Sequence, residues 1–233
     1  MKQSFATGYI RSIAIAVLCS ISTPTFSAPI VTYNIPQTGS NYTNIPPSGV
    51  AIDISASTLA ATNTLTPNTF GNHFYFRNWN TTINSAKYYQ NTLTVAPGKT
   101  LFLTDVSYSV EATNPVSFFS VRSSLDGFTS DIDLFAANGV VVTNRTSNLT
   151  GLGPITGAIT FRFYATAPNP GARMGFANHL PGAAGAGSEI PGRNIRFSGL
   201  VVPEPASLLL GLIACIGLCA PQRSRNRVRR FPD

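Results

Sequence analysis

Three carboxylates lie close together near the middle of the sequence and are the first residues whose types suggest chemistry. Asp126, Asp131 and Asp133 fall within eight positions, and hard cations such as Ca2+ bind several oxygen ligands gathered from one loop. The spacing differs from that of an EF-hand loop, and Asp126-Gly127 is also a common hairpin turn. We therefore favour turn residues without a cofactor and keep a calcium site as the alternative.

The histidines and acids do not form a pattern typical of an enzyme. His73 and His179 are the only two histidines, and neither stands in a nucleophile elbow or a His-Glu-x-x-His zinc motif. A glycoside hydrolase needs two carboxylates across a cleft, and the acids of residues 28–201 have no framing motif. The sequence therefore predicts a protein that is not an enzyme, with a hydrolase as the least favoured alternative.

Aromatic and cationic side chains in the strand-like runs have two interpretations each. Aromatic rings either stack on the apolar faces of sugars or pack in a core, and the rings concerned are those of Tyr75, Trp79, Tyr88 and Tyr89. Arg122 and Arg162 either line a polar groove or lay their stems on the sheet with their charges in solvent. We favour core packing and solvated arginines, and keep a carbohydrate-binding module as the alternative function.

Residues 202–233 consist of three segments with different physical roles. Val202 and Pro203-Glu204-Pro205 come first, and the apolar run 206–220 follows. This run predicts a single transmembrane helix, although about 15 residues are few for a full crossing. A basic cluster ends the chain: Arg223, Arg225, Arg227, Arg229 and Arg230. Under the positive-inside rule this cluster stays in the cytoplasm and leaves residues 28–202 on the far side.

The prolines of this tail favour a conformation that an enzyme can bind. Pro203 and Pro205 each fix φ and restrict the residue before them, which holds an extended strand. A cleft can bind such a strand at a low cost in conformational entropy. Glu204 supplies the one charge between the two prolines.

The order Val202-Pro203-Glu204-Pro205-Ala206-Ser207, apolar helix and Arg-rich end closely resembles the PEP-CTERM sorting domain. In that family the membrane enzyme exosortase, a cysteine transpeptidase-like protein, recognises the Pro-Glu-Pro motif. It then releases or transfers the protein, usually in Gram-negative bacteria that make exopolysaccharide. The resemblance implies exosortase as a partner of this chain. The alternative is an ordinary tail-anchored protein in which Pro-Glu-Pro is only a turn before the helix.

The N-terminus has the order of a secretory signal peptide. Two basic residues precede the apolar stretch 13–21, and a run of small and polar residues follows it. Cleavage after Ser27 places Thr25 and Ser27 at the positions that require small residues. We therefore predict that residues 1–27 form a signal helix, read by the Sec translocon and removed by signal peptidase.

The net charge of +7 belongs mainly to the two ends of the chain. Residues 28–201 contain nine basic and seven acidic residues, without a Lys/Arg run that would follow a phosphate backbone. Nucleic acid is therefore not an expected partner. The three cysteines lie in the terminal apolar segments, which leaves the exported region without a disulfide or a thiolate metal site.

Short strand-like runs separated by turn residues fill the region between the two processing segments. Alternating or β-branched runs occupy residues 50–54, 74–79, 91–95, 101–110, 116–122, 132–135, 140–143 and 159–165. Residues 33–47 and 169–193 are expected to be loops. This spacing predicts an all-β fold, an antiparallel β-sandwich.

The body of the chain is also similar to a recurring type of PEP-CTERM ectodomain. The similarity covers residues 87–200 and includes the phrase Val121-Arg122-Ser123-Ser124-Leu125-Asp126-Gly127-Phe128 and the later strand 159–164. Those ectodomains resemble jelly-roll sandwiches, which implies a jelly-roll-like fold here. The last strand of the pattern is divided in this chain between residues 173–176 and 194–201.

These observations predict a signal peptide at 1–27, an exported β-sandwich ectodomain at 28–201 and a sorting signal at 202–233. The protein would first be anchored in the inner membrane with its sandwich in the periplasm, and would then reach the cell surface or the medium. The expected role is structural or adhesive, in association with extracellular polysaccharide or a biofilm.

Overall fold

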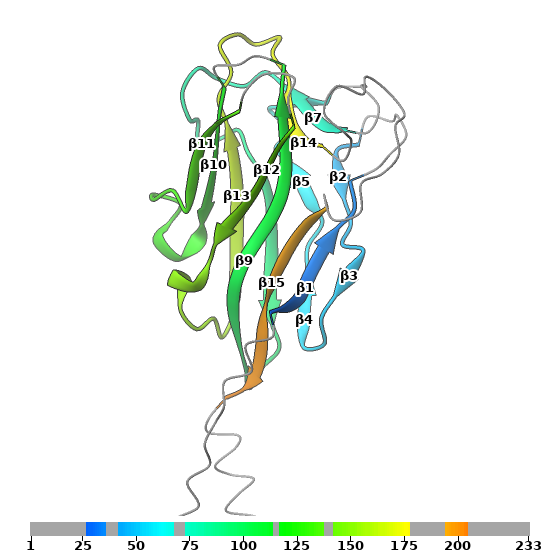
Figure 1. Ribbon diagram of the computed structural model, residues 1–233, viewed down its shortest axis with the longest axis vertical. Helices are drawn as coiled ribbons and strands as arrows, with labels where there is room; N and C mark the ends of the chain where they lie inside the picture. The colour runs from blue at the N-terminus through cyan, green and yellow to red at the C-terminus, as the bar shows by residue number, and fades with distance from the viewer. Residues whose placement is uncertain are drawn as a thin grey trace, which may run out of the picture.

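The computed structural model describes residues 27–35, 42–67, 73–113, 117–137, 142–177 and 194–204. These residues form two antiparallel sheets that pack face to face (Figure 1). Among them, no helix is long and apolar enough to span a membrane. The predicted signal residues 1–26, the helix 206–220 and the basic cluster lie outside the described residues.

The first sheet, called the β9 sheet, has the order β3-β1-β15-β9-β14-β7-β6, with β12 on the other edge of β9. Its strands are β1 (Ala28–Tyr33), β3 (Gly49–Val50), β6 (Thr66–Pro67), β7 (His73–Arg77), β9 (Lys99–Ala112), β12 (Thr143–Asn148), β14 (Met174–Ala177) and β15 (Ile195–Pro203). β9 is the longest strand and runs along most of the sandwich in Figure 1. It therefore organises this layer.

The second sheet, called the β13 sheet, has the order β11-β10-β13-β8-β5-β2, with β4 also paired to β8. Its strands are β2 (Asn44–Ile45), β4 (Ile54–Ala56), β5 (Leu59–Ala61), β8 (Tyr89–Val95), β10 (Ser117–Ser123), β11 (Asp133–Ala137) and β13 (Ala158–Ala165). Two 3-10 turns, η1 (Ser124–Asp126) and η2 (Thr150–Leu152), lie between strands. The prediction of an all-β antiparallel sandwich is confirmed.

Aromatic rings from both sheets fill the space between the layers. Phe161 of β13 packs on Phe197 of β15 with ring centroids 4.8 Å apart, and Phe163 meets Phe176 of β14 at 5.2 Å. The period-2 alternation of the strands turns these residues inward and their polar neighbours outward. Each buried ring removes a large apolar area from water, which is the main stabilising contribution to such a fold.

The divided last strand is confirmed by the pairing along β9. Ser107 pairs with Thr146 of β12 on one side and with Arg196 of β15 on the other. Val110 pairs with Thr143 of β12 and with Phe176 of β14. β14 and β15 therefore share the same edge of β9, one after the other, because both lie opposite β12.

Both ends of the described fold lie at the same end of the sandwich. Ala28, the first residue of β1, pairs with Gly199 of β15, and β15 continues from there to Pro203, which pairs with Lys99. The Glu204 amide then donates a hydrogen bond of 2.9 Å to the Gly98 carbonyl. β15 thus runs two residues past the predicted border at 201, and Figure 1 shows it ending at the bottom of the view.

The strand predicted at residues 50–54 was wrong. The structure has two short strands, β3 and β4, separated by a turn at Ile52 and Asp53. Asp53 adopts φ of 67°, a left-handed conformation that a regular strand cannot include. The alternating residues therefore mark a turn between strands of different sheets.

Candidate functional site

The outer face of the β13 sheet gathers the most unusual set of polar and aromatic side chains in the described chain. Ile159, Phe161 and Phe163 of β13 are fully buried between the layers, so Arg162 and Tyr164 point to the opposite face. Arg162 lies directly across from Arg122 of β10 and from Gln90 of β8. We call the group of Tyr88, Arg122, Phe128, Arg162 and Tyr164 the stacked-arginine face.

Arg162 lies close to the faces of two aromatic rings. Its guanidinium carbon is 4.1 Å from the centroid of Tyr88 and 3.8 Å from that of Phe128. Tyr88 in turn meets Tyr164 edge to face at 5.6 Å. Such cation–π contacts attract the cation to the electron-rich ring face. The two rings hold the planar cation in place without neutralising its charge.

The loop after β10 positions Phe128. Gly127 and Phe128 both adopt left-handed φ angles, of 70° and 64°, and this conformation is uncommon for a bulky residue. The Phe128 amide donates a hydrogen bond of 2.9 Å to the Ser123 carbonyl. The Ser124 hydroxyl accepts a hydrogen bond of 3.0 Å from the Thr160 amide. These bonds fold the loop back over β13, which brings the Phe128 ring to Arg162.

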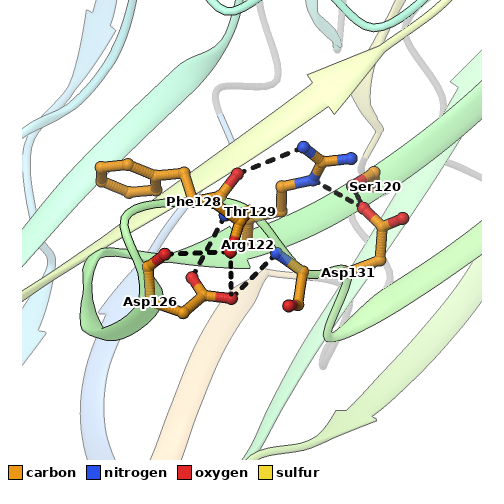
Figure 2. Close-up of polar contacts among 7 residues, drawn as sticks. Ser120, Arg122, Asp126, Phe128, Thr129 and Asp131 are labelled. Atoms are coloured by element: carbon orange, nitrogen blue, oxygen red, sulfur yellow. Dashed lines mark hydrogen bonds and ion pairs between the residues drawn. The ribbon is translucent and has the colours of Figure 1, made fainter.

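Asp126 caps the same loop from within. Its carboxylate accepts hydrogen bonds from the Thr129 and Ser130 amides at 3.3 and 2.8 Å (Figure 2). The interactions with Ser130 lower the pKa of Asp126 most, with a further contribution from Thr129. Asp126 therefore stabilises a turn, as the sequence predicted for Asp126-Gly127.

Arg122 makes the polar contacts that Arg162 lacks. Its Nε donates a hydrogen bond of 2.7 Å to the Asp131 carboxylate, and its Nη1 donates one of 3.2 Å to the Phe128 carbonyl (Figure 2). The Ser120 hydroxyl also donates to Asp131, and the Arg122 guanidinium lies 5.4 Å from the Tyr164 ring centroid. Asp131 therefore neutralises Arg122, and its hydrogen bonds with Ser120 and Arg122 hold the loop against β10.

Arg162 has no hydrogen bond or ion pair to any of the described residues, and its Nε is buried without a partner. The terminal amino groups of Arg162 also have no hydrogen-bond partner among the described residues, but they are not buried and reach solvent. Burying a donor of a charged group without a partner is costly. The stacked-arginine face therefore presents one cation whose hydrogen-bonding capacity is unused.

Asp133 belongs to a separate group at the edge of the sandwich, which we call the edge network. It accepts hydrogen bonds from Arg145 Nε at 3.1 Å, the Ser147 hydroxyl at 2.8 Å and the Tyr108 hydroxyl at 3.1 Å. Burial opposes ionisation of Asp133, but the bonds from Arg145, Ser147 and Tyr108 outweigh it and lower the pKa of the carboxyl. Asp133 lies on the β13 sheet and its partners on the β9 sheet, so this network joins the two layers.

The three candidate metal ligands thus face three different sets of partners. Asp126 binds its own loop, Asp131 binds Arg122 and Asp133 binds Arg145. Within the described residues no group of three or more His, Cys, Asp or Glu side chains could hold a metal ion. The side chain of His73 and all of His179 lie outside the described residues.

The favoured prediction of core packing is confirmed for Tyr75, Trp79 and Tyr89, so the alternative of a sugar platform built from these three rings and Tyr88 was wrong. These three residues are at most 3% exposed. Trp79 Nε1 donates a hydrogen bond of 2.9 Å to the Phe76 carbonyl, and the Tyr89 hydroxyl donates one of 2.7 Å to the Met174 carbonyl. Buried Trp and Tyr commonly satisfy their polar atoms in this way. Tyr88 alone is half-buried, on the stacked-arginine face.

The four residues of the predicted sorting motif lie at and beyond the end of β15. Val202 and Pro203 pair with Thr100 and Lys99 of β9, and Glu204 is held by its amide bond to Gly98. Pro205 lies outside the described residues. The first part of the motif is therefore an extended strand at the end of the sandwich.

Comparisons with known proteins do not assign this chain to a family. No family model matches the chain, and no curated protein does. Two similar solved structures are single-residue variants of CBM29-2, a family 29 carbohydrate binding module, each 11% identical. They cover 63% of this chain and 88% and 89% of their own, with TM-scores of 0.32 and 0.30. At these scores their ligands have no bearing on this chain.

Proposed function

We propose that this chain is an exported surface protein whose tail is cut by exosortase. In this proposal the sandwich has a structural or adhesive role in an extracellular polysaccharide matrix. The observation that carries it is the position of the two ends of the fold. β1 begins at Ala28, directly after the proposed signal cleavage site, and β15 ends at Pro203, inside the proposed sorting motif. Two processing sites inferred from residue types thus coincide with the first and last strands.

The geometry of these ends suits a domain that stands on a membrane. Ala28 pairs with Gly199, so the segments before β1 and after β15 leave from one end of the sandwich. A protein held by an N-terminal signal and a C-terminal helix needs both attachments on one side. The opposite end and the outer sheet faces then remain available to the matrix.

The conformation of the motif agrees with recognition by a cleft. Enzymes and adaptor domains often bind peptides in extended form, where the main chain supplies hydrogen bonds and alternate side chains enter pockets. Pro203 is already extended in β15. The enzyme would need to break only the bond between Glu204 and Gly98 and the last pairs of β15 to take hold of the motif.

The jelly-roll class is part of this proposal. β15 returns after a long connection to lie beside β1, which is the kind of return that a Greek-key arrangement requires. Jelly rolls consist of two such units in two facing sheets. The order of the strands in both sheets supports this class.

A carbohydrate-binding module is the second candidate function. On the outer face of the β13 sheet, the Phe118 and Leu134 side chains are 48% and 52% exposed. Ser120 pairs with Leu134 and with Tyr164, so these apolar side chains are continuous with the stacked-arginine face. An exposed ring beside polar groups is the combination that stacks on a sugar.

The first proposal is tested by the fate of the tail in a bacterium that contains exosortase. Mass spectrometry of the full chain should show loss of the residues after the motif, and deletion of exosortase should leave the tail intact. Replacing Pro203-Glu204-Pro205 by alanines should keep the protein in the inner membrane. A matched variant, Pro46→Ala with Pro47→Ala, removes two prolines elsewhere and should be processed normally. A tail retained with and without exosortase would exclude the proposal.

A further inference from the structure

The cross-strand pair of Arg122 and Arg162 leaves one positive charge without a partner. Like charges placed directly opposite each other on neighbouring strands repel. Asp131 neutralises Arg122, and Asp126, the other acid of the loop, is turned toward Thr129 and Ser130. Within the described part of the chain, no carboxylate approaches Arg162 closely enough for an ion pair.

The surroundings of Arg162 leave only one edge of its guanidinium for binding. Tyr88 and Phe128 cover the planar group, and its Nε is buried. The remaining donors are the terminal amino groups, which reach solvent. A fixed, planar pair of N–H donors matches the geometry of a carboxylate, which accepts two parallel hydrogen bonds. The side chain is already ordered, so little rotamer entropy is lost when a ligand binds.

We propose that Arg162 anchors a binding site for the carboxylate groups of an acidic polysaccharide. The assignment to a sugar rests on the proposed function, in which the sandwich works in a polysaccharide matrix. The exposed Phe118 ring lies on the same face, four residues before Arg122 along β10. At about 3.4 Å per residue, Phe118 is roughly 14 Å along the strand from the Arg122–Arg162 pair, a span that a chain of several sugar units can bridge.

The hydroxyl groups beside Arg162 extend the same surface. Thr92 and Thr160 form a hydrogen-bonded pair of 2.8 Å between β8 and β13, one alternate position from Gln90 and Arg162. Hydroxyls and amides are the groups that pair with sugar hydroxyls once the charged group is held. The site therefore combines one cation, neutral polar groups and an exposed ring.

The experiment measures binding of polygalacturonate, with dextran as the neutral polymer, to the full chain in a mild detergent by calorimetry. Wild type should bind polygalacturonate and not dextran. Because a charge-assisted bidentate pair is lost, Arg162→Gln should weaken the affinity by about tenfold or more. Arg162→Lys keeps the charge and the stem but lacks the planar fork, and should weaken it by about threefold to tenfold. This second variant keeps the test valid if the first fails to fold.

The matched control is Arg196→Gln, which removes the same charge from an exposed position on the β9 sheet. Its affinity should stay within about twofold of wild type, because exposed charges contribute little at physiological salt. Equal losses in Arg196→Gln and Arg162→Gln would reduce the site to net charge and overturn the proposal. Binding of polyglutamate as tight as that of polygalacturonate would overturn the sugar assignment. Normal tail cleavage with no binding would reject this site alone and leave the sorting proposal standing.

Discussion

The edge network and the stacked-arginine face use arginine in opposite ways. Arg145 is joined to Asp133 by two hydrogen bonds, and Tyr108 and Ser147 complete the carboxylate's partners. Arg162 is held by two rings and has no polar partner within the described chain. A carboxylate whose two oxygens both accept hydrogen bonds from fixed donors stabilises the structure, whereas a positioned cation without a polar partner is available to a ligand.

The difference follows from where each group lies. The edge network connects β11 of the β13 sheet to β9 and β12 of the β9 sheet, so its bonds close one side of the sandwich. The stacked-arginine face lies on the outer side of one sheet, the β13 sheet. Loss of the edge network should loosen the packing of the two layers. Loss of the stacked-arginine face should change only what the surface binds.

The largest expected effect is that of Asp133→Ala. Its removal leaves Arg145 without its carboxylate, and it leaves the Tyr108 and Ser147 hydroxyls with only each other as a hydrogen-bond partner, at 3.0 Å. The Asp133 side chain is 10% exposed, but that of Arg145 is 36% exposed and partly screened by water. We therefore expect a loss of about 2 kcal/mol in the free energy of unfolding, measured by denaturant unfolding of the full chain in detergent.

Asp131→Ala is the matched control for that loss. It breaks the pair with Arg122, in which the carboxylate is more exposed than Asp133, at 27% against 10%, and should cost about 1 kcal/mol or less. If Asp131→Ala destabilised the protein as much as Asp133→Ala, the network between the sheets would have no special role.

The second expected effect is a dependence of the free energy of unfolding on pH, caused by the ionisation of Asp133. The folded state lowers the pKa of this carboxyl relative to its ordinary value. Its stabilising contribution is therefore complete above the unfolded pKa of about 4 and is lost as pH falls through the folded pKa. The difference in unfolding free energy between wild type and Asp133→Asn should be constant from pH 7 to 5 and should shrink below pH 4. A difference that grows on acidification would contradict the sign of this shift.

The sequence predicted most of the fold because the core strands carry clear alternation. β8 and β13 have buried, mostly apolar residues at every second position, and β9 keeps this period on either side of a change of phase between Leu103 and Val106. β12 extends through residues 143–148, Thr-Asn-Arg-Thr-Ser-Asn, where the sequence shows no apolar period. Such a strand owes its place to pairing with β9 and to Arg145 and Ser147, which are long-range contacts that a local pattern does not contain.

The candidate site was only partly visible in the sequence. Arg122 and Arg162 were singled out by their positions in strands, but their different surroundings depend on a loop. Phe128 was missed as a site residue. The only local signal is an aromatic residue directly after Asp126-Gly127, and its left-handed φ of 64° could not be read from residue types. The distribution of partners between two identical side chains is a property of tertiary structure.

The smallest expected effect on stability is that of Arg162→Met, and it provides the sharpest contrast with Arg145→Met. Arg162 has no polar partner to leave behind, and a thioether between two rings regains part of the lost contact. Replacing this half-buried cation by an apolar side chain of similar length should therefore change the free energy of unfolding by no more than about 0.5 kcal/mol. Arg145→Met should lose about 2 kcal/mol, since Asp133 would then be unpaired. The two variants are compared by the same denaturant titration. Equal losses would mean that Arg162 is a structural residue that fastens the η1 loop, and the contrast between the two regions would disappear.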